Sequence, residues 1–544
     1  MKCVQAVGGG WSSRFGVVTF MAIALGFFAS GAQAAQNTAT RSFEKTLTLG
    51  TNQTLSLESK FGEVHIHGEN GREARIMATI RAQASSQSEA DKNADEIKIE
   101  VSQDASGIRV KTVYPEDRVV LRIHRGSSYT VDYDIALPVD ARLWVRTGFG
   151  NTDIRGVQGW ADVENSHGQL NSHDSGSTKL VNSFGSVEAS SATGNVWIVN
   201  NNGSVKASAI KGALDVKDRF ASITISNVQG QVTISGGNGA VELTDAEAST
   251  VSNSFGSVAA RNIHGDLTVN NNNGQIDVDT VQGAATLTGS FGAINFTNVT
   301  GYVKCTSTNG KVKGGPTGND AYVKTSFGEV WVEQIGGALQ VEDSNGNITA
   351  KEVKGKAEFN TSFGSIEANA LRKSVRATTG NGRVSLNDVG GDVAVKTSFG
   401  SVNVQRVNGN LRIENSNGPV VGTSISGDAS AKTSFGSVTL EDVAGSITVD
   451  NQNGTVMLSE ARNSSGCKSI NARTSFAPIQ VRISEGGNYN VTARTSFGRI
   501  SSELPITSTG QMGGDSLNGK IGNGGCTLSL TNANGNIDIL KLAK

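Results

Sequence analysis

Aromatic residues that stand near lysines are the clearest candidates for binding chemistry in this sequence. Tyr302 and Tyr322 each precede a lysine by two residues, at strand positions where side chains are expected to face solvent. An exposed ring can stack on a sugar or anchor a protein partner, and a lysine attracts acidic groups. The alternative is that these rings pack across strands and stiffen the sheet. The candidate ligand-binding residues are Tyr302, Lys304, Tyr322, Lys324, Trp160 and Trp197.

Residues that could support catalysis or hold a metal are scattered. His65 and His67 lie two apart on one expected strand, which gives half a metal site with no third ligand in the sequence. Calcium-binding nonapeptide repeats need an aspartate in each turn, and the repeats here carry Ser, Asn and Phe instead. We therefore expect no catalytic residue, cofactor or metal, although a catalytic cleft built from distant turns stays open as an alternative.

The elements that position these residues follow a strict repeat. Phenylalanine followed by Gly or Ala recurs in steps of 35 or 36 residues, at Phe149, Phe184, Phe220, Phe255, Phe291, Phe327, Phe363, Phe399 and Phe435. Eighteen residues after each of these Gly or Ala positions comes another Gly, preceded by Asn except at His167-Gly168. A third marker, such as Gly445, lies midway, so the unit is nine residues and two units make eighteen. Such a period indicates a repeat architecture.

Each nine-residue unit has the pattern of one short strand. In the segment that begins at Gly436, Val438 and Leu440 share one face, while Ser437 and Thr439 share the other. Asn-Gly corners also suit an antiparallel meander, which is the alternative fold. Residues eighteen apart are chemically alike, however, and this favours parallel stacking. We predict an all-β parallel solenoid over residues 146–544, with eighteen-residue coils and about 21 coils between Gly150 and Gly535.

The row of corner phenylalanines has two interpretations. Continuing the alternation from Ala429 and Ala431 places Phe435 inside, in a ladder between asparagines of the coils above and below. Alternatively, the rings form an exposed binding stripe with one Phe in every second coil. The sequence favours the inward ladder.

The sequence predicts a free Cys305 and leaves the pairing of Cys467 and Cys526 open. Cys305 stands four residues after Gly301, at an inward strand position, so it should be a small buried hydrophobe. Export would permit a disulfide between Cys467 and Cys526. Counting corners along the chain, however, puts them about three coils apart, roughly 14 Å, which is too far for a bridge.

The first 145 residues differ from the repeats. Residues 1–34 have a positive start, an apolar stretch at 17–29 and the small-x-small site Ala32-Gln33-Ala34, as in a signal peptide; a short membrane anchor is the alternative. Residues 35–145 are predicted to form a β-rich N-terminal or capping domain. Its expected elements are one helix at 86–97 and strands at 46–57, 63–67, 74–82, 108–113, 119–123 and 129–137.

Composition narrows the class of protein further. The 544 residues include 67 Gly and only 6 Pro, which excludes collagen and proline-rich linkers. The net charge is −1 with no basic tract, so we expect no nucleic-acid partner. Beyond residue 34, no apolar run is long enough to span a bilayer, so no membrane span is expected after signal cleavage.

Residues 57–68 and 133–145, followed by the Gly-x-Val repeats, resemble the bacterial putative-adhesin family of exported β-solenoid proteins, a domain of unknown function. The resemblance covers nearly the whole mature chain. It implies a β-solenoid and supplies no catalytic motif.

Together these observations predict a non-enzymatic, exported scaffold or binding protein that is periplasmic, on the cell surface or secreted. Its expected partner is a surface glycan or an envelope protein. One alternative is an envelope-associated regulatory or sensing protein that binds another protein. The other is a polysaccharide-acting β-helix enzyme.

Overall fold

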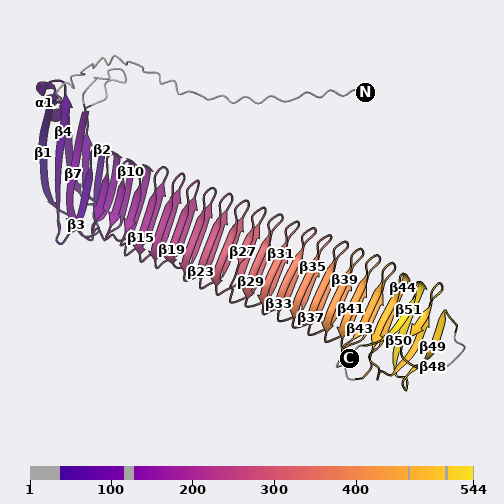
Figure 1. The fold of residues 1–544 in the computed structure, drawn as a ribbon. Helices are drawn as coiled ribbons and strands as arrows, with labels where there is room; N and C mark the ends of the chain where they lie inside the picture. Colours follow the sequence, from indigo (N-terminus) through magenta and orange to yellow (C-terminus); the bar gives the residue numbers. More distant parts are fainter. Residues whose placement is uncertain (1–36, 116–127, 463–465, 509–512, 543–544) are drawn as a thin grey trace, which may run out of the picture.

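The computed structural model describes residues 37–115, 128–462, 466–508 and 513–542. The predicted signal peptide at 1–34 and the strand predicted at 119–123 lie outside these ranges. The described chain is an all-β solenoid drawn out into a long rod (Figure 1). Two parallel sheets, A and B, run along the rod, and the chain crosses from one to the other at every corner.

Four groups of elements make up the fold. The N-terminal cap and first turns contain β1 (Asn37–Thr48), β2 (Thr54–Phe61), β3 (Val64–Glu69), β4 (Glu73–Ala84), α1 (Gln87–Glu96), β5 (Lys98–Asp104), β6 (Gly107–Val113), β7 (Ser128–Pro138), β8 (Arg142–Phe149) and β9 (Thr152–Arg155). The repeating strands of sheet A are β11 (Leu170–His173), β13 (Val187–Ser190), β15 (Val205–Ile210), β17 (Ile223–Val228), β19 (Val241–Ala246), β21 (Val258–Ile263), β23 (Ile276–Val281), β25 (Ile294–Val299), β27 (Val312–Gly314), β29 (Val330–Ile335), β31 (Ile348–Val353), β33 (Ile366–Leu371), β35 (Val384–Val389), β37 (Val402–Val407), β39 (Val420–Ile425), β41 (Val438–Val443), β43 (Val456–Glu460) and β45 (Ile479–Ile483). Those of sheet B are β10 (Ala161–His167), β12 (Thr178–Phe184), β14 (Val196–Asn200), β16 (Leu214–Asp218), β18 (Val232–Gly236), β20 (Ser249–Asn253), β22 (Leu267–Asn271), β24 (Ala285–Gly289), β26 (Val303–Ser307), β28 (Ala321–Lys324), β30 (Leu339–Glu342), β32 (Ala357–Asn360), β34 (Val375–Thr378), β36 (Val393–Lys396), β38 (Leu411–Glu414), β40 (Ala429–Lys432), β42 (Ile447–Asp450) and β44 (Ile470–Phe476). The C-terminal end holds β46 (Tyr489–Arg494), β47 (Ile500–Ser502), β48 (Ile506–Ser508), β49 (Ser516–Ile521), β50 (Cys526–Asn534) and β51 (Ile537–Lys541).

The strand register confirms the eighteen-residue coil. In sheet A, Val402 lies opposite Val420 and Val420 opposite Val438, all in parallel pairing. Parallel pairing excludes the antiparallel meander. From the pair β10–β11 to the pair β44–β45 the rod contains eighteen successive turns. The stretch from Gly150 to Gly535 holds fewer stacked turns than the 21 estimated from length, because the chain stops advancing regularly after β45.

The core is the thin layer between the two sheets. Val438, Leu440, Ile447 and Val449 are buried, as the strand alternation predicted. The opposite faces of the same strands are half-buried at Ser437, Thr439 and Ser446 and exposed at Thr448. Val456 and Leu458 hold the equivalent positions on the next turn and are buried too, as the same alternation predicts. Inward Val, Ile, Leu and Ala therefore supply the hydrophobic stabilisation, with each turn covered by its two neighbours.

A buried polar column runs along the corner that follows each strand of sheet B. Thr397 and Asn415 occupy it on consecutive turns, and both are buried. The Asn415 side chain donates to the backbone oxygens of Gly400 and Gly418, both at 3.0 Å, while Thr397 Oγ1 accepts from Gly400 N at 3.3 Å. The column thus satisfies backbone groups that a tight corner would otherwise leave unpaired.

This polar column overturns the inward ladder of phenylalanines. At most of these corners the last inward residue is a Thr or Asn, such as Thr433, and strand alternation ends there. Two residues later the corner has turned, so the ring of Phe435 points outward and is 63% exposed. The other corner rings are also exposed, at Phe149, Phe184, Phe220, Phe255, Phe291, Phe327, Phe363, Phe399, Phe476 and Phe497.

Hydrogen bonding continues across the domain boundary predicted at residue 145. β2 pairs in parallel with β8, with Thr54 opposite Arg142, and β3 pairs in parallel with β9, with Val64 opposite Thr152. The pair β2–β3 therefore belongs to the solenoid stack, next to the turn β8–β9. On its other side β6 pairs in parallel with β2, and β7 pairs in parallel with β3, so β6 and β7 continue the two sheets toward the N-terminal end of the rod.

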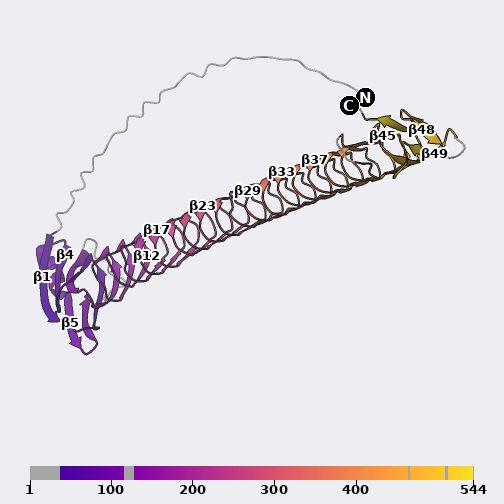
Figure 2. The same ribbon diagram turned by 90° about the horizontal axis from the view of Figure 1, so that it is seen from below.

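The elements β1, β4, α1, β5, β6 and β7 close the N-terminal end of the core (Figure 2). β7 and β4 extend sheet A and pair antiparallel to each other, β1 pairs antiparallel to β4, and β5–β6 extends sheet B. Helix α1 is capped by Ser86, whose hydroxyl accepts from Glu89 N at 3.3 Å, and it buries Ala90 and Ala94 against the core. Such a cap covers apolar surface that an end turn would expose.

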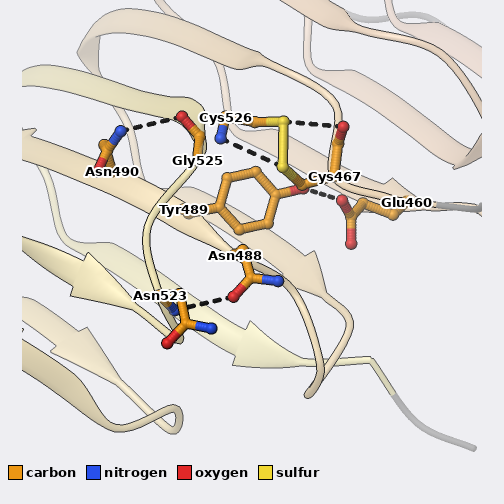
Figure 3. Close-up of a disulfide and its surroundings, with 8 residues drawn as sticks. All are labelled: Glu460, Cys467, Asn488, Tyr489, Asn490, Asn523, Gly525 and Cys526. Atoms are coloured by element: carbon orange, nitrogen blue, oxygen red, sulfur yellow. Dashed lines mark hydrogen bonds between the residues drawn. A yellow bond between two sulfur atoms is a disulfide. The ribbon is translucent and has the colours of Figure 1, made fainter.

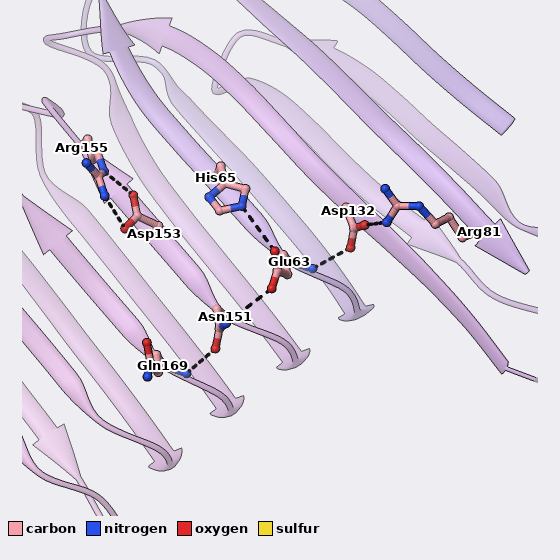
Figure 4. A network of polar contacts seen from close by, with 8 residues as sticks. All are labelled: Glu63, His65, Arg81, Asp132, Asn151, Asp153, Arg155 and Gln169. Atoms are coloured by element: carbon pink, nitrogen blue, oxygen red, sulfur yellow. Dashed lines mark hydrogen bonds and ion pairs between the residues drawn. The ribbon is translucent and has the colours of Figure 1, made fainter. Parts of the chain in front are cut away.

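Polar contacts join this cap to the first turns on the outer face of sheet A (Figure 4). Asp132 of β7 accepts from the backbone nitrogen of Glu63 at 2.9 Å and also pairs with Arg81 of β4. Asn151 donates to the Glu63 carboxylate at 3.4 Å and accepts from Gln169 N at 2.9 Å. The network thus spans cap and solenoid in one continuous chain of contacts.

The C-terminal end contains a change in strand order. β50 pairs in parallel with β44, with Ile470 opposite Leu528, and also with β46. β51 lies in the same way between β45 and β47. The turn β50–β51 is therefore inserted between two turns that precede it in the chain.

This insertion makes the predicted separation of the two cysteines wrong. Cys467 and Cys526 form a disulfide, with Cα atoms 5.8 Å apart (Figure 3). Counting corners along the chain placed them three coils apart, whereas β44 and β50 are direct neighbours. Cys305 is free and buried, as predicted, and burial raises the pKa of its thiol.

Candidate functional site

A groove on the outer face of sheet B is the candidate site. Its volume is about 690 Å³, and it crosses the turns from Tyr302 to Arg412. Six rises of about 4.8 Å separate the turn of Tyr302 from that of Asn410, so the groove is about 29 Å long. Its lining side chains include Tyr302, Asp320, Tyr322, Ala338, Gln340, Lys356, Glu358, Ser374, Arg376, Asp392, Ala394, Asn410 and Arg412.

The groove arises because outward side chains of unequal length stack in columns. Residues at the same place on successive turns are held in register, as Ala321 is opposite Leu339 and Leu339 opposite Ala357. Short side chains at Ala338, Ser374 and Ala394 interrupt columns of longer ones and leave the surface hollow between them. The hollow is thus a property of seven consecutive turns rather than of one loop.

The two predicted tyrosines meet at one end of this groove. Tyr302 directly precedes β26, while Tyr322 lies on the neighbouring strand β28, opposite Lys304. The Tyr302 ring is 40% exposed, and Tyr322 is half-buried. Burial, helped by the Asp320 carboxylate, raises the pKa of Tyr302, and burial with the Glu342 carboxylate raises that of Tyr322. Both hydroxyls therefore stay protonated at neutral pH and can donate hydrogen bonds.

The two predicted lysines flank the tyrosines without lining the groove. Lys304 is exposed on the strand beside Tyr322. Lys324 Nζ lies 3.2 Å from a Glu342 carboxylate oxygen, and this hydrogen bond raises its pKa. The Lys324 ammonium is therefore paired with a carboxylate of the same sheet.

The predicted tryptophans lie elsewhere and pack against other side chains. Trp160 and Trp197 contact each other edge to face, with ring centroids 5.4 Å apart, nearer the N-terminal end of sheet B. Trp331, on sheet A, has the Lys313 ammonium 5.0 Å from its ring centroid and that of Lys351 at 5.9 Å. These geometries fit the packing interpretation given for outward rings.

Sequence reasoning missed the cationic half of the groove. Lys356, Arg376 and Arg412 project from the turns beyond Tyr322. The signal was present, because each stands one or three residues after a midway corner Gly or its equivalent and so faces outward. The strand pattern did not indicate that the small residues Ala338, Ser374 and Ala394 would leave a hollow between these side chains.

Two of the three acidic residues that line the groove, Asp320 and Asp392, bond to the neighbouring turn. Asp320 Oδ1 accepts from Ala338 N at 2.7 Å, and Asp392 Oδ1 accepts from Asn410 N at 2.8 Å. Each bond joins one turn to the next, eighteen residues along. These carboxylates therefore act as ties between coils.

Among the described residues, no group of three or more His, Cys, Asp or Glu is arranged to hold a metal ion. His65 and His67 instead lie near the carboxylates of Glu63, at 3.6 Å, and Glu69, at 3.0 Å. Within the same ranges, no helix is long and apolar enough to cross a membrane.

Comparisons with known proteins add little to this geometry. No protein-family model and no curated protein matches the sequence. The chain is similar to a crystal structure of a putative cell adhesion protein from Clostridium sporogenes, at 7% identity and a TM-score of 0.13, over 92% of this chain and 100% of that one. It is also similar to a putative lipid binding protein from Parabacteroides distasonis, at 12% identity and a TM-score of 0.14, over 69% of this chain and 96% of that one. Likenesses this weak carry no argument about function, so the adhesin-family resemblance stays a prediction.

Proposed function

We propose that this chain is a non-enzymatic, exported binding scaffold that holds an elongated glycan of the cell surface in the groove on sheet B. The observation that carries the proposal is the groove itself, with Tyr302 and Tyr322 at one end and Lys356, Arg376 and Arg412 beyond them. The tyrosine rings offer stacking faces for sugars, and the cations suit acidic or hydroxylated substituents. Export is proposed from the signal-like residues 1–34 alone.

Binding is favoured over catalysis by the state of the groove carboxylates. A glycosidase needs two carboxyl groups free to act as acid and base or nucleophile. Of the three carboxylates that line the groove, Asp320 and Asp392 accept backbone hydrogen bonds from the next turn, so Glu358 is the one that remains. This arrangement supports a ligand-holding surface.

A glycan array probed with the purified chain tests the proposal. The variant Tyr302→Ser/Tyr322→Ser should lose at least about fivefold in affinity for the glycan bound, because each ring contact contributes about 0.5–1.5 kcal/mol. Thermal unfolding should change little, since both rings are outward. Trp331→Ser on sheet A is the matched control and should bind as the wild type does.

Two results would redirect the proposal. Retention of an envelope protein by the immobilised chain, with no glycan bound, would favour the alternative of a regulatory or sensing protein. Release of reducing or unsaturated sugars from polysaccharides would favour the enzyme.

A further inference from the structure

The exposed corner phenylalanines form a second surface, which we name the Phe ladder. It consists of Phe149, Phe184, Phe220, Phe255, Phe291, Phe327, Phe363, Phe399, Phe435, Phe476 and Phe497, each 49% to 76% exposed. The rings occupy one corner of the rod on every second turn, so successive rings are separated by about 9.6 Å, two turns of about 4.8 Å. Apolar surface repeated in this way along one edge calls for a partner.

The turn between two rings carries a small polar residue at the same corner. Phe184 lies opposite Asn202, and Asn381 and Asn417 stand eighteen residues on either side of Phe399. Each Phe-Asn-Phe set therefore leaves a slot above the asparagine. The slot is one turn from either ring.

One slot shows what fits in such a space. His167 takes the place of the asparagine between Phe149 and Phe184. Its ring stacks on both, with centroids 4.4 Å and 4.8 Å away and interplanar angles of 14° and 13°. A flat ring placed in a slot thus contacts both walls at stacking distance.

The alternation of Phe and Asn follows position in space rather than order in the chain. At the C-terminal end, Phe476 lies opposite Asn534, and Asn534 lies opposite Phe497. In the sequence both phenylalanines precede Asn534, which reaches its slot only because β50 is inserted between β44 and β46. Duplication of a sequence repeat would not by itself place an Asn between Phe476 and Phe497. The alternation of Phe and Asn is therefore kept in the folded rod even where the order in the chain does not provide it.

We propose that the Phe ladder is an interface between two copies of this chain, arranged antiparallel with the rings of each copy in the slots of the other. Because the two copies have the same sequence, the spacing between successive Phe rings is the same in both. A two-fold axis perpendicular to the rod, midway between a Phe turn and an Asn turn, brings the Phe residues opposite Asn residues of the mate, apart from the one Phe that would face His167. Rings from the two copies then alternate every 4.8 Å or so, the spacing that His167 shows within one chain.

The chemistry and size of the ladder suit this occupant. Phe363, Phe399 and Phe435 each stand between a Ser and a Gly, so no like charges meet at these rings. A half-exposed Phe offers roughly 100 Å² for burial, so about ten rings from each copy, leaving out the slot that His167 fills, bury on the order of 2,000 Å². Stable interfaces bury about 1,200–2,000 Å².

Sedimentation equilibrium of the purified chain tests the proposal. The wild type should dimerise, and Phe363→Asn/Phe399→Asn/Phe435→Asn should raise the dissociation constant at least about tenfold. The fold should persist, because asparagine occupies this corner on the alternate turns, and circular dichroism checks this. Tyr302→Asn, an outward ring on sheet B, is the control and should dimerise normally.

Filling the slots separates interdigitation from general stickiness. Asn381→Phe/Asn417→Phe adds apolar surface but occupies two slots from within, as Phe61 already stacks on Phe149 of the adjacent turn at 5.5 Å. Interdigitation predicts weaker dimerisation, whereas non-specific association, or a surface made for lipid, predicts stronger self-association or vesicle binding. A wild type that stays monomeric at about 100 µM, or a slot-filled variant that associates more tightly, would overturn the proposal.

Discussion

Cys467 and Cys526 are 59 residues apart in the chain and 5.8 Å apart at their Cα atoms. The bond joins the start of the turn β44–β45 to the start of the inserted turn β50–β51. The Tyr489 ring lies beside it, and Cys526 N donates to Cys467 Sγ at 3.2 Å (Figure 3). The disulfide therefore fastens the inserted turn to its new neighbour.

Removing this disulfide should loosen the C-terminal end specifically. For a closed loop of 59 residues, chain entropy gives about 4 kcal/mol of stabilisation. Cys467→Ser/Cys526→Ser should show earlier unfolding and faster amide exchange in β46 to β51, with the central turns little changed. Cys305→Ser is the control for loss of a thiol without loss of a bridge. Uniform destabilisation along the whole rod would contradict a local role.

Asp218 should make stability depend on pH. It is buried in the polar column, and this burial raises its pKa from 3.8 to about 6. Between these values the folded chain binds more protons than the unfolded chain, so the free energy of unfolding falls as pH rises. Asp218→Asn should thus stabilise the chain by about 1–3 kcal/mol at pH 7.5 and hardly at all near pH 3.5.

Asparagine fits this position, since Asn200 occupies it on the preceding turn. Asp215→Asn, on the outer side of the same strand, is the matched control for loss of a charge. Chemical denaturation at both pH values measures the difference. Equal stabilisation at both pH values would rule out the buried carboxylate as its cause.

The buried contact between Tyr489 and Glu460 should stabilise the C-terminal end of the rod. Tyr489 is fully buried and donates its hydroxyl to the Glu460 carboxylate, and burial together with that carboxylate raises the pKa of Tyr489. Tyr489→Phe removes the donor and leaves Glu460 with the backbone nitrogen of Ser484, at 2.9 Å. The expected loss is about 1–3 kcal/mol in denaturant unfolding. Adding Glu460→Gln should recover part of it, because the remaining group is then uncharged.

Gly314 should not tolerate a side chain. A Cβ atom added there would lie 2.0 Å from the Phe296 ring, which is buried on the adjacent strand of sheet A. Gly314→Ala should therefore lower stability by about 1–3 kcal/mol through overpacking. Phe296→Leu/Gly314→Ala should be more stable than Gly314→Ala, and a double-mutant cycle measures the coupling. Additive effects would mean that the two side chains do not compete for space.

The sequence predicted the fold of the repeats because each turn repeats the same physical problem. The inward positions of Val438 and Leu440 recur eighteen residues later at Val456 and Leu458. The length of the repeat and the burial of these positions could therefore be deduced from the sequence alone. The alternation failed at the corner, where Thr433 takes the last inward place and Phe435 turns out. Alternation is a property of extended backbone and says nothing once the chain bends.

The candidate site was predictable only in part. Tyr302 and Tyr322 could be placed at outward positions on adjacent turns, because these positions follow from the strand register alone. The groove also depends on small side chains such as Ala338 and Ser374 on several different turns. Its depth at each of them is set by the longer side chains on the neighbouring turns. The disulfide was missed because β50 enters the stack out of order, and irregular spacing after β45 shows a break without showing where the strand goes.

The inserted turn imposes an order on how the molecule is made. β46 and β47 stack on β50 and β51 rather than on the turn that precedes them in the chain. During synthesis, residues 489–502 emerge before the surface that will cover them exists. A chain interrupted ahead of residue 526 would carry β44 and β45 as a bare edge, open to strand addition from another molecule. Completion of this end is therefore a late step of folding, and a chain cut short before residue 526 leaves that edge exposed.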